Sequence, residues 1–303
     1  MSSRVWAAIA AAAVGFGTSG VATRAALNAG VPPYTLVTVR ALGGALVVLA
    51  ILVAMRRPVP LDRATWRNGL TFSVFQIALP YVLFTLAYQN ASAGFVGLLA
   101  ALFPLGTATI AHFALPDEPM SAGKALGLLI ALAGVGVMLL SGDSGLAEGG
   151  RPVLAFGLGI VAVVSISVSG IIAKHQSHHY GVLEITGIQS ALAFVWLTVV
   201  TLFVEGTPAV PTTWAMVLLG YLVLMGSVVP FLLFYWLLRH VSTTRASLIG
   251  YLVPFVALVT GIVLIDERLE AGIAIGGLLI LAGVMWTDRA ERKVVPRRAV
   301  VPH

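Results

Sequence analysis

Long apolar tracts, separated by short polar or Pro/Gly-rich breaks, dominate this chain. A helix that crosses a bilayer needs roughly 20 mostly apolar residues. The spacing of the breaks predicts ten such helices, at about 5–26, 34–55, 68–88, 93–115, 122–141, 152–173, 182–204, 213–237, 244–265 and 271–288. Ten helices leave only short connections, so no separate soluble domain fits. The pattern predicts an all-α polytopic membrane protein.

Two stretches of the chain are similar to each other. Residues 115–135 read LPDEPMSAGKALGLLIALAGV and residues 264–284 read LIDERLEAGIAIGGLLILAGV, which agree at twelve of twenty-one positions at a shift of 149. Matched apolar residues arise easily by chance, but a shared Asp-Glu pair followed by glycine does not. Further pairs obey nearly the same shift: Arg24 with Lys174, Arg40 with Gln189, Pro80 with Pro230, and Pro104 with Pro254.

The repeat unit contains five helices, and this odd number has a consequence for topology. The second copy must enter the membrane from the side opposite to the first, which makes the two copies an inverted repeat. We therefore expect a first five-helix repeat at 1–145, a second, inverted one at 146–290, and a basic tail at 291–303. The first apolar tract resembles a signal peptide, but its counterpart in the second copy favours a mature helix.

Composition supports the membrane assignment. The chain has 303 residues, of which 59% are hydrophobic and only 10% are charged. A soluble domain usually carries about 25% charged residues, so most of this surface must face hydrocarbon. The chain has no cysteine, which excludes disulfides and cysteine metal sites.

The basic residues are distributed unequally between the two sides of the expected bundle. With the amino terminus in the cytoplasm, three basic residues lie outside (Arg24, Arg151, Arg268), Arg40 lies within a span, and fourteen lie inside: Arg4, Arg56, Arg57, Arg63, Arg67, Lys124, Lys174, Arg239, Arg245, Arg289, Arg292, Lys293, Arg297 and Arg298. This bias predicts a multi-pass protein of the cytoplasmic (inner) membrane with both termini cytoplasmic. The basic tail fits an anchor near anionic lipid, and we expect no nucleic-acid partner.

Several residues together resemble the EamA family of the drug/metabolite transporter superfamily. The first copy carries Phe16-Gly17, Arg24, Pro33, Arg40, Pro104, Glu118, Gly127 and Gly134, and the second carries Lys174, Gln189, Pro254, Glu267 and Gly283. Phe16 stands where the family commonly has Trp. The resemblance implies a ten-helix secondary carrier of small metabolites, often an exporter of amino acids, including aromatic ones. No cofactor is expected.

Aromatic and hydroxyl side chains are candidates for the substrate pathway. Tyr81, Thr85 and Tyr88 share one face of the third helix, and the corresponding tract carries Tyr235 and Trp236. Aromatic rings with polar tips suit a cavity for an amphipathic solute. Tyr88 also fits an interfacial belt, and burial of Tyr81 against another helix would produce the same pattern.

Hydroxyl groups and prolines offer two further sets of candidates. Thr18, Ser165 and Ser169 could bond to substrate, although packing between helices accounts for any single one of them more simply. Prolines free backbone carbonyls and bend helices. The matched prolines are therefore candidate hinges: Pro80, Pro104, Pro230 and Pro254.

Charged groups within the spans are few. An arginine inside a span should face the protein interior or extend to the interface. Arg40 could attract an anionic group or bond to carbonyls and hydroxyls where helices meet, and its neutral counterpart Gln189 favours the structural role. Arg24 is expected to extend to the outer interface or to guide anions at the mouth. No Asp or Glu lies near the middle of a span, so a carboxylate relay is not expected.

Other function classes lack their motifs. No GxxxxGK[ST] phosphate loop and no HExxH pair occur, which argues against an ATP-driven pump and a zinc enzyme. The histidines at 175, 178 and 179 lack acidic partners, so a solvated loop explains them better than a metal site. A channel is disfavoured by the repeat and by the lack of a filter motif. The aromatic face favours neutral amino acids and similar amphipathic metabolites as substrates, the family resemblance adds aromatic amino acids, and a monomer suffices.

Overall fold

The computed structural model describes residues 3–58, 62–114, 120–176, 181–207, 211–240 and 248–294, and within these ranges it contains helices and no strand. The α-helices are α1 (Ser3–Asn28), α2 (Pro33–Ala54), α3 (Arg63–Phe72), α4 (Leu79–Asn90), α5 (Ala93–Ala100), α6 (Phe103–Ala114), α7 (Ala122–Ser141), α8 (Pro152–Gln176), α9 (Val182–Val204), α10 (Thr213–Val223), α11 (Val229–His240), α13 (Leu248–Ile265) and α14 (Ala271–Val294). Two π-helical segments, η1 (Ser73–Ala78) and η2 (Leu224–Val228), join α3 to α4 and α10 to α11.

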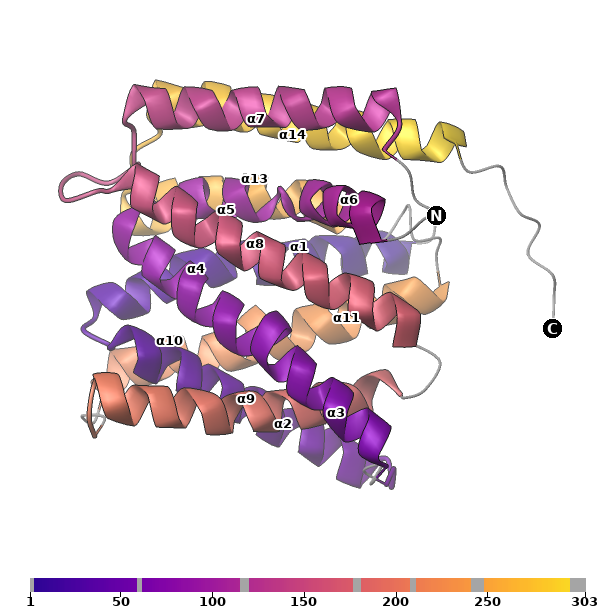
Figure 1. Cartoon of the computed structure of the whole chain (residues 1–303). Helices are drawn as coiled ribbons and strands as arrows, with labels where there is room; N and C mark the ends of the chain where they lie inside the picture. The colour runs from indigo at the N-terminus through magenta and orange to yellow at the C-terminus, as the bar shows by residue number, and fades with distance from the viewer. Residues whose placement is uncertain are drawn as a thin grey trace.

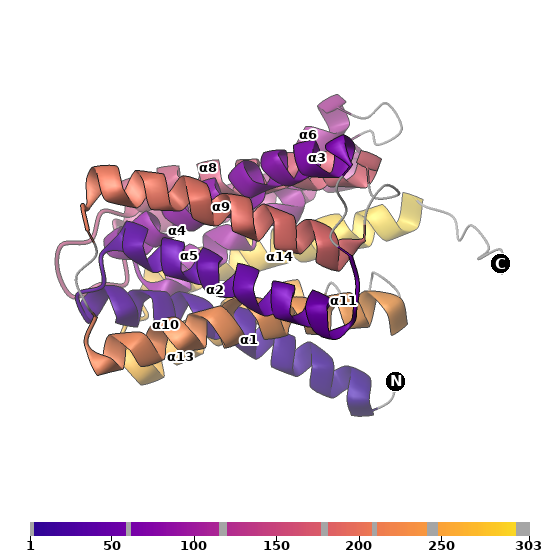
Figure 2. The same ribbon diagram turned by 90° about the horizontal axis from the view of Figure 1, so that it is seen from below.

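The helices run roughly parallel or antiparallel to one another and form one bundle. α1 begins and α14 ends at the same end of this bundle in both views (Figures 1 and 2). We call this the terminal end and the opposite one the distal end. The two edges of the bundle are formed by helix pairs, α7 with α14 and α2 with α9 (Figure 1).

The described parts of the ten predicted tracts are helical. Eight helical spans are long and apolar enough to cross a membrane, and two shorter apolar stretches occur at Thr213–Val228 and Leu252–Ile265. The span predicted at 93–115 is present as Ala93–Ala114, and it consists of two helical segments, because α5 ends at Ala100 and α6 begins at Phe103. Pro104 has no N–H to continue the hydrogen-bond ladder across this point.

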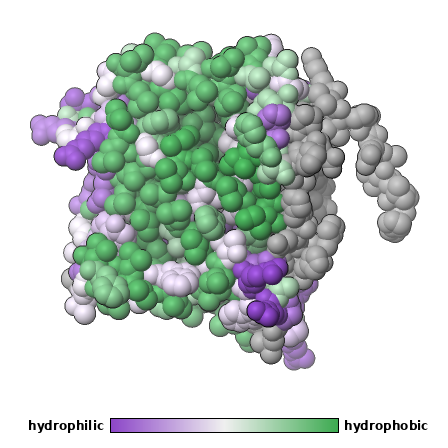
Figure 3. Space-filling model, in the orientation of Figure 1, coloured by the Kyte–Doolittle hydropathy of each residue, from purple (hydrophilic) through white to green (hydrophobic). Residues whose placement is uncertain are grey.

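The outer surface is apolar over a broad central belt (Figure 3). Large apolar side chains within the helices are exposed, for example Leu278 (70%), Leu129 (63%) and Phe255 (61%). Hydrophilic residues gather at the two ends of the bundle in the same view. Contiguous apolar surface of this extent is rare on soluble proteins, and it fits a protein surrounded by lipid.

The α7–α14 pair packs through glycines. A Cβ atom on Gly127 would lie 2.6 Å from the carbonyl oxygen of Gly283, and one on Gly134 would lie 2.5 Å from that of Gly276. The two contacts run in opposite directions along the helices, which are therefore antiparallel. Small residues allow this close backbone approach, which stabilises helix pairs in a membrane.

Four of the described helices begin at a side-chain N-cap. The caps of α3, α5, α7 and α10 accept a hydrogen bond from the backbone N–H three residues on: Asp62 from Thr65 (2.8 Å), Ser92 from Phe95 (3.0 Å), Ser121 from Lys124 (3.2 Å) and Thr212 from Ala215 (3.2 Å). Such caps satisfy N–H groups that lack a partner within the helix. Hydrogen bonds from Thr65 lower the pKa of the Asp62 carboxyl below its ordinary value.

Candidate functional site

A cavity in the described structure lies between the two predicted repeats. It contains about 750 Å³ of empty space, counting the part that opens to the outside. Its wall comes from α2, η1 and α4 of the first repeat and from α9, η2 and α11 of the second. The polar groups in the wall include Arg40, Gln76, Tyr81, Gln189, Ser190 and Ser227, and most of the remaining wall is apolar.

The cavity extends towards the terminal end. On α2 it runs from Arg40 to Val48, towards the C-terminus of that helix, and on α9 it runs from Ser190 back to Leu183, near the start of that helix. These ends of α2 and α9 meet on the terminal side of the bundle, where Arg57 and Glu184 form an ion pair at 3.5 Å. The cavity is therefore nearer to the terminal end than to the distal end.

Two matched prolines explain why polar side chains gather beside the π-helical segments. Pro80 follows η1 and cannot donate an N–H to the preceding turn. The carbonyl oxygen of Phe75 instead accepts a hydrogen bond of 2.7 Å from Ser165 Oγ on α8. A helix broken by proline thus acquires its missing donor from a neighbouring helix.

Pro230 follows η2 in the same way, and Arg40 supplies the donor there. Arg40 Nη2 donates to the carbonyl oxygen of Gly226 at 2.8 Å, and its Nε donates to Ser227 Oγ at 2.8 Å. The guanidinium group also lies over the Tyr81 ring, with its carbon 4.4 Å from the ring centre. Arg40 thus bonds to a carbonyl and a hydroxyl where helices meet, and it also lines the cavity.

Three neutral polar side chains in the wall remain uncommitted. Gln76, Gln189 and Ser190 make no side-chain hydrogen bond with the residues that the structure describes, and all three line the cavity. Nη1 of Arg40 is also without a bond to the described residues. An amide can both donate and accept, so these groups can orient a solute that carries donors and acceptors.

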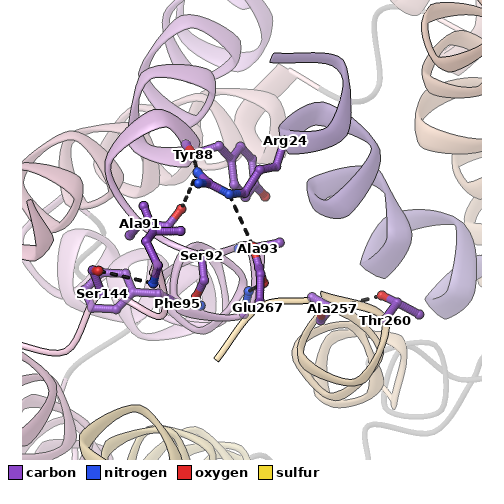
Figure 4. Close-up of polar contacts among 12 residues, drawn as sticks. Arg24, Tyr88, Ala91, Ser92, Ala93, Phe95, Ser144, Ala257, Thr260 and Glu267 are labelled. Carbon is purple, nitrogen blue, oxygen red and sulfur yellow. Dashed lines mark hydrogen bonds and ion pairs between the residues drawn. The ribbon is translucent and has the colours of Figure 1, made fainter. Parts of the chain in front are cut away.

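A polar cluster around Glu267 lies at the distal end of the bundle (Figure 4). This carboxylate accepts hydrogen bonds from the backbone N–H groups of Ala93 (2.6 Å) and Gly94 (3.4 Å) at the start of α5. It also forms an ion pair with Arg24 of α1, with Nε 3.6 Å from Oε1. The expectation that Arg24 extends outwards is wrong, because its side chain is only 15% exposed and turns inwards. Burial raises the pKa of Glu267, although the N–H groups and Arg24 act in the opposite direction.

The predicted hydroxyl candidates bond within the protein instead of lining the cavity. Thr18 Oγ1 lies 2.6 Å from both the Val14 carbonyl oxygen and the Tyr221 hydroxyl. Ser165 bonds to Phe75, as described above, and Ser169 Oγ donates to the carbonyl oxygen of Ile166 at 3.2 Å. For these three residues the geometry favours packing over substrate contact.

The aromatic candidates divide into two groups. Tyr81 lines the cavity, whereas Thr85 is buried and lies nearer to the distal end. The Tyr88 hydroxyl packs against Gly20, where a Cβ atom would lie 2.6 Å from it. Trp236 packs outside the cavity, against a hydrophobic cluster that is formed mainly by α1 residues such as Ile9 and Ala12. The side chain of Tyr235 lies outside the described part of the structure.

The candidate hinges occupy different settings. Pro80 and Pro230 adjoin the π-helical segments at the cavity, Pro104 stands at the start of α6, and Pro254 lies inside α13.

Metal binding has no support in the described residues, where no group of three or more metal-ligating side chains occurs. The histidine cluster at 175, 178 and 179 lies outside the described side chains.

Sequence reasoning missed four residues of interest: Gln76, Ser190, Ser227 and Glu267. The first three carry no motif, and only the packing of α2 against α9, η1 and η2 brings them to one cavity. Glu267 did carry a signal, since it belongs to the repeated Asp-Glu pair. Beyond the repeat and the family resemblance, the sequence indicated no role for this residue.

Comparison with known proteins gives a consistent result. The EamA-like transporter family matches residues 4–140 and again residues 153–287. The uncharacterized transporter YoaV of Bacillus subtilis (strain 168) is 25% identical over 263 residues, which cover 84% of this chain and 86% of YoaV. The uncharacterized inner membrane transporter YedA of Escherichia coli (strain K12) is 26% identical over 242 residues, covering 79% of this chain and 76% of YedA. One solved crystal structure shares the fold, with a TM-score of 0.65 at 20% identity over 98% of this chain and all of its own.

Proposed function

Since this chain belongs to the EamA-like transporter family, we propose that it is a secondary transporter that exports small amphipathic metabolites by alternating access. Neutral and aromatic amino acids are the first candidate substrates. The observation that carries the proposal is the cavity between the predicted repeats, in which uncommitted polar groups face an otherwise apolar wall. Such a wall suits a solute with one polar and one apolar part.

Arg40 gives this cavity a preference for one kind of polar group. It is the one charged side chain in the described wall, and no carboxylate faces it there. Its Nη1 can donate to a carboxylate of the solute. The amides of Gln76 and Gln189 can accept from an ammonium or amide group. An amino acid supplies both kinds of partner together with an apolar side chain.

Several pairs of matching features support the inverted repeat on which alternating access depends. The π-helical segments η1 and η2 both precede a matched proline, Pro80 and Pro230. At a shift of 149, Gly127 corresponds to Gly276 and Gly134 corresponds to Gly283. In the structure each glycine of α7 contacts the counterpart of the other, because Gly127 meets Gly283 and Gly134 meets Gly276. Two inverted copies that share one cavity can exchange conformations and open it alternately to each side. One chain supplies a complete pathway, so the proposal needs only a monomer.

Transport in proteoliposomes tests the proposal. Purified protein should take up labelled L-phenylalanine with saturable kinetics, and unlabelled L-phenylalanine on the opposite side should accelerate the exchange. Linear, non-saturating flux would indicate a channel, and product formation without transport would indicate an intramembrane enzyme. Gln189→Ala should lower the uptake, whereas Gln89→Ala, at an exposed position of α4 outside the cavity wall, should leave it unchanged.

The topology needs a separate test, which the absence of cysteine makes simple. Ala147 is exposed in the connection between α7 and α8 at the distal end, and Ser3 is exposed at the terminal end. With both termini cytoplasmic, an impermeant thiol reagent should label Ala147→Cys in whole cells and should label Ser3→Cys only after lysis. The reverse pattern would overturn the proposed orientation.

A further inference from the structure

Glu267 is a buried carboxylate in a connection between two helices. It follows α13, and its side chain is only 5% exposed. The first two N–H groups of α5 donate to its two oxygens, and the third N–H, of Phe95, donates to Ser92 Oγ. A residue of the second predicted repeat thereby caps a helix of the first.

Arg24 ties two more elements of the first repeat to this carboxylate. Its Nε faces Glu267, and its Nη1 donates to the carbonyl oxygens of Tyr88 and, at 3.4 Å, of Ala91. α1, the end of α4 and the start of α5 therefore meet at one carboxylate (Figure 4). A motion that parts the two repeats at the distal end would separate Glu267 from Arg24 and from the start of α5, which belong to the other repeat.

Few other ionisable groups face Glu267. Tyr88 of α4 is near enough to interact with it electrostatically, while α5 and α13 carry no charged side chain. On its own loop, Glu270 accepts from the N–H of Gly145, and the backbone N–H of Arg268 donates to the Gly145 carbonyl oxygen. Asp143, on the neighbouring connection, accepts from Gly272. Within the described residues, Arg24 is the one charge at ion-pair distance from Glu267.

We propose that Glu267 is a proton-binding site that controls the distal end of the transport pathway. Neutral Glu267 favours the closed arrangement, and ionised Glu267 favours opening and hydration of this end. This inference rests on the proposed function, because it assumes a pathway that opens between the predicted repeats. It adds the proton as a ligand, at a site separate from the substrate cavity.

The direction follows from the energetics of a buried charge. Removing a carboxylate from water costs free energy that a single cation and two N–H groups repay only in part, and the raised pKa of Glu267 agrees with this. Opening hydrates the carboxyl and returns its pKa towards the ordinary value. The closed arrangement therefore binds the proton more tightly, so acid favours closure and deprotonation favours opening.

Thr85 is a suitable reporter of opening. It lies one helical turn from Tyr81 towards the distal end, it is 3% exposed, and the chain contains no other cysteine to react. The rate at which a thiol reagent labels Thr85→Cys in detergent would be measured at each pH. The labelling ratio is this rate divided by the labelling rate of the exposed Ala147→Cys. This ratio removes the pH dependence of the reagent itself. The ratio should rise from about pH 5 to about pH 8, by about tenfold for each unit by which the two pKa values differ.

Three substitutions in the Thr85→Cys background identify the group responsible. Glu267→Gln should keep the ratio low at every pH. Arg24→Gln removes the cation that stabilises ionised Glu267 in the closed arrangement. Ionised Glu267 should then favour opening more strongly than in the parent, so the labelling ratio at high pH should be higher and its rise should extend to higher pH. Glu270→Gln, on the same loop but bonded to Gly145, should behave as the parent.

Two results would overturn the inference: a parent ratio that does not change with pH, or a rise that persists in Glu267→Gln. If Glu267→Gln fails to fold, as judged by gel filtration, Arg24→Gln decides alone, and an unchanged profile would then contradict the inference. Because labelling needs no substrate, its outcome is independent of the L-phenylalanine assay. A failed transport assay with a pH-dependent ratio would reject the proposed substrate and leave the proton site standing.

Discussion

The guanidinium carbon of Arg40 lies 4.4 Å from the centre of the Tyr81 ring, at the point where the two predicted repeats enclose the cavity. The same guanidinium bonds to Gly226 and Ser227 across the boundary between the repeats. One side chain thus combines a structural contact with a position in the cavity wall. The ring of Tyr81 holds the charge in place, because a cation is attracted to an aromatic face.

Tyr81→Ala removes this aromatic support. A cation–π contact contributes about 1–2 kcal/mol, so we expect L-phenylalanine uptake to fall about tenfold while folding and membrane insertion persist. Tyr81→Phe keeps the ring and should retain most of the uptake. An equal loss of folded protein, measured by gel filtration and membrane yield, would instead assign Tyr81 to packing.

Ser165→Ala removes the donor to the Phe75 carbonyl oxygen. A buried carbonyl left without a partner costs about 1–3 kcal/mol, and thermal unfolding in detergent should show a corresponding loss. Ser169→Ala is the matched control, because that hydroxyl donates to a carbonyl of its own helix and has no other bond among the described residues, and it should cost less.

The role of the proline can be separated by a double-mutant cycle. Pro80→Ala returns an N–H to the helix, which can then satisfy a carbonyl of the preceding turn. Ser165→Ala should therefore cost less in the Pro80→Ala background than in the parent. Additive effects in this cycle would show that the Ser165 hydroxyl does not compensate for the proline.

Gly134→Ala introduces a methyl group into the α7–α14 contact. Its Cβ would lie 2.5 Å from the Gly276 carbonyl oxygen, so two helix backbones must move apart. We expect a loss of about 1–3 kcal/mol in stability. Gly136→Ala, two residues further on, has no heavy atom within 4 Å of the new Cβ and should be neutral or slightly stabilising. Equal unfolding temperatures for the two variants would contradict the observed packing.

Asp62 should make a pH-dependent contribution to stability. Its folded-state pKa is lowered by the N–H of Thr65, so the stabilisation is present above the ordinary aspartate pKa and is lost as the pH falls through the lowered value. The difference in unfolding temperature between the parent and Asp62→Ala should therefore shrink below about pH 4. Thr212→Ala removes a cap that does not titrate, so its effect on the unfolding temperature should be the same above and below about pH 4. A constant Asp62→Ala difference would be evidence against a cap by the ionised carboxylate.

The sequence by itself determined where helices form and that they lie in a membrane. These properties depend on local composition, because a run of about 20 apolar residues has few alternatives in water or lipid. The matched prolines Pro80 and Pro230 were also visible in the sequence, and both stand next to π-helical segments in the structure. Pro104 indicated a bend in the fourth span, but the apolar pattern continues through Ala101–Leu102 and did not show where the helix is interrupted.

Only the tertiary structure decided which polar side chains face the cavity. Ser165 and Gln76 have similar apolar surroundings in the sequence, yet one is bound to a freed carbonyl and the other faces empty space. Glu267 lies in a polar connection, and its burial depends on Arg24 and Ala93, which are far away in the chain. Hydrogen-bond partners and desolvation arise between helices that pack together, and hydropathy along one helix does not encode them.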